Sequence, residues 1–242
     1  MMAWRRTLLL FSLAAPLPAG CAELFLPDAA PWAEETAQHE KKGMAVDIAA
    51  ALQDRSGIPL TVTLMPMPRQ IASLRAADHG FALIGSYQDL PDQIVRLGNG
   101  FELPIFAVAR EEDPAPTAEN LSQGRRVGMV RGGRHMMPAA LAGMLTIEEF
   151  PDIAAGLKML EARRLDALVI SSPVIAALGE AGFAAHHLGA PQPLFAGRAT
   201  LVASTAAASS KEGQSLAAAW DEMCRDGTVA RILQGSAAAL VK

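Results

Sequence analysis

Short apolar runs recur along the chain at the length of buried strands. Residues Leu60–Leu64 alternate apolar and polar side chains, which predicts a strand with one buried face. Three further runs are continuously apolar, as in parallel strands covered on both faces. They are Phe81–Ile84, Val127–Val130 and Leu168–Ile170. The sequence therefore predicts at least four strands spread over the chain.

Helical spacing appears between and after these runs. One stripe is formed by Ile153, Leu157, Leu160 and Arg164, with the arginine closing the face. A second stripe is formed by Leu216, Trp220, Met223 and Cys224. Gly227 follows it at a C-cap position, and residues 229–233 predict another short helix. The alternation of strands and helices predicts an α/β fold.

Two polar, proline-containing stretches divide the chain. Residues 111–124 predict a surface loop, and residues 189–193 predict a second break. Because the two breaks bracket a middle segment, we expect two lobes joined by two crossings. The alanine-rich stretch 203–208 is interpreted as a strand end or loop.

The N-terminus has the pattern of an export signal. Arg5 and Arg6 precede an apolar run too short to span a bilayer, and small residues follow up to Ala22. We therefore expect residues 1–22 to be a signal peptide and the mature protein to be periplasmic. Cys21 leaves lipid anchoring open as the less favoured alternative, since Pro18 stands where lipoprotein signals usually have leucine.

Composition narrows the function classes. The 242 residues are 51% hydrophobic and carry a net charge of −4, which excludes a disordered chain and does not favour nucleic-acid binding. The two cysteines and five scattered histidines form no metal-ligand pattern. There is no nucleophile elbow and no glycine-rich nucleotide motif. We expect no metal, no cofactor and no enzymatic activity.

Six short motifs occur in one order along the chain. They are Gly43–Leu52, Leu90–Gln93, Phe101–Pro104, Gly124–Val130, Arg163–Val169 and Asp226–Ile232. In this order they resemble the family 3 extracellular solute-binding proteins, which are type 2 periplasmic binding proteins of amino-acid importers. The resemblance implies two lobes, each a mixed, mostly parallel sheet flanked by helices, with two hinge crossings. It assigns residues 23–104 and 194–242 to the first lobe and 105–193 to the second.

The resemblance also marks two departures at the ligand site. Gln93 stands where amino-acid binders of the family have an arginine that clamps the α-carboxylate, unless Arg96 takes that position. Ser171 stands where they have an aspartate that pairs with the α-ammonium. A neutral amide and a hydroxyl cannot replace two charge-assisted hydrogen bonds. The ligand is therefore not expected to be a standard α-amino acid.

Other ligand positions follow from the same resemblance. Trp32 falls where the family places an aromatic ring against the ligand, although a core role is an equal alternative. Arg69 follows a strand and could replace the lost anion clamp, or could be a solvated residue of a first helical turn. Three residues after the strand Phe81–Gly85 are expected to meet the ligand: Ser86, Tyr87 and Gln88.

A glycine loop completes the predicted site. Gly132, Gly133 and Arg134 lie between a strand and a helix, where backbone N–H groups and positive charge favour an anion. We therefore predict a monomeric periplasmic binding protein that delivers a small polar ligand, with an anion as one candidate, to the membrane subunits of an ABC-type importer. The alternatives are a dehydratase of cyclohexadienyl acids on the same scaffold and an accessory binding module. The dehydratase needs a carboxylic acid in the cleft, for which Asp89 is the one candidate.

Overall fold

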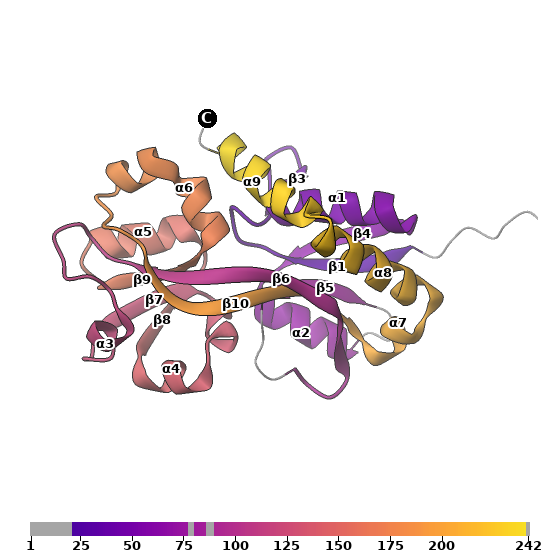
Figure 1. Cartoon of the computed structure of the whole chain (residues 1–242), viewed down its shortest axis with the longest axis horizontal. Coiled ribbons are helices and arrows are strands. Elements are labelled where there is room, and N and C mark those ends of the chain that lie inside the picture. Colours follow the sequence, from indigo (N-terminus) through magenta and orange to yellow (C-terminus); the bar gives the residue numbers. More distant parts are fainter. Residues whose placement is uncertain (1–20, 77–79, 86–89, 241–242) are drawn as a thin grey trace, which may run out of the picture.

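One mixed sheet runs through both halves of the molecule (Figure 1). The computed structural model describes residues 21–76, 80–85 and 90–240. Within these residues, eight strands form one sheet. Their order is β4 (Leu60–Met65), β1 (Ala22–Pro27), β5 (Phe81–Gly85), β10 (Gln192–Ser204), β6 (Ile94–Val108), β9 (Ala167–Ser171), β7 (Arg126–Val130) and β8 (Thr146–Phe150). The four strands predicted from the sequence are confirmed as β4, β5, β7 and β9.

The long strands β6 and β10 belong to both halves. They pair antiparallel from Ile94–Ser204 to Ala107–Gln192, with register shifts between Pro193 and Phe195 and between Ala199 and Leu201. On one side of this ladder, β10 pairs with β5, and β1 and β4 follow in parallel. On the other side, β6 pairs with β9, and β7 and β8 follow in parallel. The predicted two-lobed α/β fold with two crossings is confirmed.

Helices cover both faces of the first lobe. One face carries α1 (Met44–Ser56), α8 (Lys211–Arg225) and α9 (Thr228–Leu240), and the other carries α2 (Met67–Ala76) (Figure 1). The stripe predicted on α8 is confirmed, since Leu216, Trp220 and Met223 are fully buried against β1 and its neighbours. Gly227, with a φ of +77°, separates α8 from α9 as predicted. Flanking this lobe, β2 (Glu34–Glu35) and β3 (Lys41–Lys42) form a small antiparallel ladder.

The second lobe has the same layered arrangement. One face of its strands carries α5 (Ile153–Glu161) and α6 (Ser172–Ala185) (Figure 1). The other carries α3 (Ala118–Leu121), α4 (Ala139–Met144) and the 3₁₀ turn η1 (Gly133–Met136). Each face has its own apolar cluster, so the strands of this lobe are buried on both sides as their sequences predicted.

Three local predictions need correction. The stripe ending at Arg164 is too long, because α5 ends at Glu161 and Arg163 has a φ of +55°. The stretch 203–208 is not a strand end or loop throughout, because α7 (Thr205–Ser209) begins there, capped by the Ser204 hydroxyl, which accepts from the N–H of Ala207. The break at 189–193 overlaps β10, whose first two residues already pair with β6.

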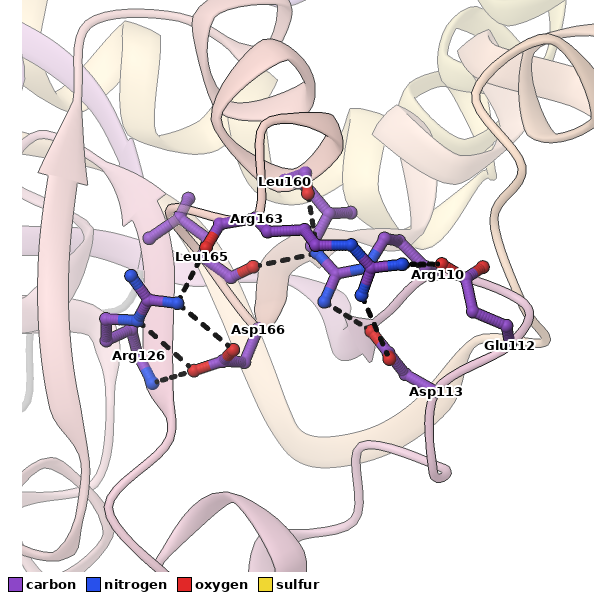
Figure 2. A network of polar contacts seen from close by, with 8 residues as sticks. All are labelled: Arg110, Glu112, Asp113, Arg126, Leu160, Arg163, Leu165 and Asp166. Carbon is purple, nitrogen blue, oxygen red and sulfur yellow. Dashed lines mark hydrogen bonds and ion pairs between the residues drawn. The ribbon is translucent and has the colours of Figure 1, made fainter.

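A polar network fixes the turn that follows α5 (Figure 2). The guanidinium of Arg110 is buried, and its Nη1 donates to the carbonyl oxygens of Leu160 at 2.5 Å and Leu165 at 3.0 Å. Its Nη2 pairs with Asp113 at 2.5 Å. Beside it, the backbone N–H of Arg126 donates to Asp166 at 2.7 Å. The network thus joins a loop, the end of α5, the segment that leads into β9 and the start of β7.

The motif residue Asp166 has a structural role. Burial alone would raise the pKa of its carboxyl, but hydrogen bonds from the backbone and guanidinium of Arg126 lower that pKa overall. Asp166 therefore stays ionised at neutral pH and holds the start of β7 against the segment that leads into β9.

The two cysteines are free. Cys21 is exposed, and Cys224 is half-buried. Burial raises the pKa of the Cys224 thiol to about 11, so this thiol is protonated and unreactive at neutral pH. Among the described residues, no helix is long and apolar enough to cross a bilayer. Residues 1–20 lie outside the description and β1 begins at Ala22, so the signal peptide remains a prediction.

Replacing Arg110 with alanine should destabilise the protein by about 3 kcal/mol, because two buried carbonyls and Asp113 lose their partner. Urea unfolding measures this loss. Arg163→Ala is the matched control, since the Arg163 side chain is 64% exposed and pairs at the surface with Glu112. It should cost less than about 1 kcal/mol. Equal losses in the two variants would show that the buried network does not stabilise the lobe.

Candidate functional site

A cavity lies where the two lobes meet. Its empty volume is about 840 Å³, including its open mouth. The first lobe lines it with the loop after β1, the start of α2 and the end of β5. The second lobe lines it with the ends of β7 and β9, the turn η1 and the first residues of α5 and α6. Open α/β sheets bind their ligands at the carboxyl ends of parallel strands, so this cavity is the candidate binding site.

The wall of this cavity is apolar. None of the described residues that line it has a charged side chain, and three of them are the methionines Met67, Met129 and Met136. The indole of Trp32 and the hydroxyl of Ser171 are the polar side-chain groups in the described wall. Transferring a charge into such surroundings without a partner costs several kcal/mol. The expectation of an anionic ligand therefore does not fit the described wall.

Trp32 stands at the junction of the lobes. Its half-buried side chain lines the cavity and also packs against the main cluster of the first lobe and both clusters of the second. Trp32 therefore both lines the cavity and packs against the core, so both alternatives considered for this residue apply. A ring held on several sides has little freedom to reorient, so it forms a preorganised part of the wall.

The first motif of the chain holds this tryptophan. The N–H groups at the start of α1 donate to the loop: Ala45 to the carbonyl of Trp32 at 2.8 Å and Met44 to that of Pro31 at 3.3 Å. Gly43 has a φ of +121°, and a Cβ there would lie 2.6 Å from the Trp32 carbonyl oxygen. Only glycine fits both conditions, so Gly43 allows α1 to approach and fix the loop.

Ser171 ends β9 at the floor of the cavity. It is 7% exposed and pairs with Ile105 of β6. It also precedes α6, but its hydroxyl makes no capping hydrogen bond to that helix. No other hydrogen bond of this hydroxyl is found in the described part of the chain, so it remains available to a ligand.

The glycine loop after β7 closes on its own lobe. The N–H of Gly132 donates to Oε1 of Glu149 at 3.0 Å. A carboxylate of the protein therefore already takes the position that an anionic ligand would occupy at this N–H. Gly133 lines the cavity, whereas Arg134 is exposed on η1 and is not among the described lining residues. The N–H of Gly132, which was predicted to favour an anionic ligand, is thus already bonded to a carboxylate of the protein.

Two predicted residues lie away from the cavity. Arg69 is exposed on α2, of which only Met67 lines the wall. Gln93 precedes β6, and its carbonyl accepts from the N–H of Thr205 at 2.9 Å. That end of β10 is five residues from Ala199 in the cavity wall, or about 15 Å along an extended strand.

The remaining predicted residues divide in the same way. Arg96, the alternative to Gln93, lies on β6 and pairs with Val202 of β10. It is also not among the described lining residues. Ser86, Tyr87 and Gln88 lie outside the described residues, as does Asp89. The structure therefore brings Trp32, Gly133 and Ser171 together at the cavity and does not bring Arg69, Gln93 or Arg134 there.

The two lobes touch at the edge of the cavity. A Cβ on Gly85 of β5 would overlap the Met136 thioether from the second lobe. Gly132 approaches Pro68 of α2 in the same way, since a Cβ on this glycine would lie 2.9 Å from the proline Cδ. Helix α9 also lies beside α6 of the opposite lobe. The structure is therefore that of a closed cleft.

The methionines of the wall are the residues that the sequence motifs did not indicate. Met67 belongs to the run Met65–Pro68, and Met136 follows the glycine loop, so both stood near residues singled out for other reasons. The signal in the sequence that could have indicated these wall residues is the methionine content, since the chain has 11 methionines. Methionine fills irregular apolar surfaces with a flexible, polarisable side chain, as this wall requires.

No protein-family model matches the sequence, and no curated protein matches it. Solved structures do match its fold. The GluR0 ligand-binding core in complex with L-glutamate has a TM-score of 0.73 at 10% identity, over 90% of this chain and 98% of that one. The arginine-, lysine-, histidine-binding protein ArtJ from Geobacillus stearothermophilus has a TM-score of 0.71 at 16% identity, over 89% and 94%.

A periplasmic domain of another protein has the same fold. The periplasmic VFT2 domain of Bordetella pertussis BvgS has a TM-score of 0.70 at 16% identity, over 89% of this chain and 92% of that one. Together these structures show that the chain has the two-lobed fold of periplasmic binding proteins, as the six motifs implied.

Gly43→Ala should lower the free energy of unfolding by about 2 kcal/mol or more, because the new Cβ meets the Trp32 carbonyl in a strained backbone region. It should also shift the tryptophan emission, since the loop that carries Trp32 must move. Gly57→Ala is the control: its φ is +69°, but no atom lies within 4 Å of the new Cβ. That variant should cost about 1 kcal/mol and leave the emission unchanged. Identical behaviour of the two variants would argue against the packing role of Gly43.

Proposed function

We propose that this protein is a periplasmic solute-binding protein that encloses one small ligand between its lobes and delivers it to an ABC-type importer. The observation that carries the proposal is the cavity itself. Both lobes contribute strand ends to it, and a preorganised tryptophan and an unpaired hydroxyl face it. The fold shared with ligand-binding proteins supports the same role. The importer is inferred from the motif resemblance.

The ligand is not a standard α-amino acid. Such a molecule carries both a carboxylate and an ammonium, and each needs a charged or strongly polar partner when it leaves water. The described wall offers apolar side chains, one indole and one hydroxyl. The argument against an amino-acid ligand therefore rests on the whole described wall and not only on the lack of charged residues at positions 93 and 171. Gln93 does not contribute to it, because it lies away from the cavity.

Binding is favoured over catalysis on this scaffold. A dehydratase of cyclohexadienyl acids would need a general acid beside the ligand and cationic groups for the substrate carboxylates. None of the described lining residues is acidic or basic. The wall thus has the groups that enclose a molecule and lacks, in its described part, those that would transfer a proton to it.

A thermal-shift screen of a broad metabolite library should identify compounds that stabilise the protein, while the twenty standard amino acids should not. At a ligand concentration about 100 times the Kd, binding adds about 2.7 kcal/mol to the free energy of unfolding. The same compounds should change the emission of Trp32, which lines the cavity, and not that of Trp220, which is fully buried in the first lobe.

Trp32→Phe serves as the control, because it should abolish the emission change and retain a thermal shift. The proposed function fails if no compound of the library stabilises the protein. A standard amino acid that stabilises it as strongly as any other compound would contradict the ligand class.

A further inference from the structure

The floor of the cavity holds one hydroxyl without a partner among the described residues. Ser171 as a residue is 7% exposed, and its hydroxyl neither caps α6 nor bonds to any other described group. A hydroxyl that faces an apolar cavity is most favourable when it forms a hydrogen bond. Since Ser171 lines the cavity, the missing partner is best supplied by a ligand that occupies the space above it.

The surroundings of this hydroxyl limit what that ligand can be. Val169, Ile170 and Val174 flank it on the second lobe, and Leu103 and Ile105 lie on the crossing strand β6. Apolar walls of this kind favour an apolar body, because its transfer from water removes unfavourable hydration. The methionines of the wall adapt to its outline. A ligand that places one oxygen at the floor and is otherwise apolar therefore matches the cavity.

Charged groups are found at the mouth and not at the floor. Asp28 of the first lobe and Arg131 of the second line an adjoining opening, which shares Pro27, Ala29 and Met67 with the cavity. In the glycine loop, the N–H of Gly132 already donates to Glu149. An ion at the floor would have no counter-ion in the described wall. The free energy lost when the ion leaves water would then not be recovered by a new ion pair.

From these observations we infer that the ligand is a small, uncharged, mainly apolar molecule with one oxygen that hydrogen-bonds to Ser171. This inference rests on the proposed function and specifies the ligand of the same site. It departs from the small polar ligand, with an anion as one candidate, that the sequence predicts. The hydroxyl of Ser171 both donates and accepts, so an alcohol and a carbonyl satisfy it equally.

The test compares four probes with the same six-carbon alkyl group at pH 7: 1-hexanol, heptanoate, hexylamine and 2-aminooctanoate. They differ in charge and not in apolar length. Ligand-observed NMR and Trp32 emission measure the Kd of each on the full chain. We expect 1-hexanol to bind at least tenfold more tightly than the anion, the cation and the zwitterion. Binding of heptanoate, hexylamine or 2-aminooctanoate as tightly as 1-hexanol would overturn the inference.

Two variants test the role of the hydroxyl. Ser171→Ala should weaken 1-hexanol about three- to tenfold, as expected for one net hydrogen bond. It should not weaken 1-fluorohexane, which has the same chain without the hydroxyl. Ser172→Ala changes the neighbouring serine, which is not among the described lining residues, and should leave both affinities unchanged. An unchanged 1-hexanol affinity in Ser171→Ala would overturn the assignment of the oxygen to this residue.

The outcome also separates this inference from the proposed function. If none of the four probes binds but a library compound does, the inference on ligand class is wrong and the binding function stands. If heptanoate binds most tightly, the function stands and the ligand is an anion. If neither the probes nor the library stabilises the protein, the proposed function itself fails.

Discussion

The antiparallel pairing of β6 with β10 is the interaction on which the rest of the structure depends. These two strands extend from one lobe into the other, and every other strand of the sheet joins them directly or through a neighbour. They also form part of the cavity wall, through Leu103 and Ile105 on β6 and Phe195 and Ala199 on β10. The same backbone hydrogen bonds therefore connect the lobes and shape the surface that a ligand would meet.

The chemistry of the cavity follows from how that sheet is buried. Strands covered on both faces carry apolar side chains along their length, and their last residues reach the cleft with the same character. Burial of apolar ligand surface contributes roughly 25 cal/mol per Å², whereas an unpaired charge in the same place costs several kcal/mol. The balance favours neutral molecules unless a charged side chain is added. The described wall adds none, and its one buried hydroxyl is at Ser171.

The fold could be predicted because its signals are local. The apolar runs of β4, β5, β7 and β9 and the stripe of α8 are visible in the sequence, and six short motifs gave their order. Gly133 and Ser171 could be placed at the cavity because each closely follows a strand that carries a motif, and Trp32 because the family resemblance places an aromatic ring at that position. Motif spacing does not show which end of a strand faces the cleft, and Gln93 precedes β6 at the end that lies away from the described cavity wall. The hydrogen bond from Gly132 to Glu149 joins the loop after β7 to the neighbouring strand β8, so no local sequence pattern predicts it.

The contact between Gly85 and Met136 has a consequence for how far the lobes can approach. A hydrogen atom is all that the first lobe presents to the thioether at this point. Any larger side chain at position 85 would have to displace the Met136 thioether, which is the flexible end of its side chain. The lobes approach closely at this edge because position 85 carries no side chain, and a substitution there would shift the burden of fitting onto a single methionine of the opposite lobe.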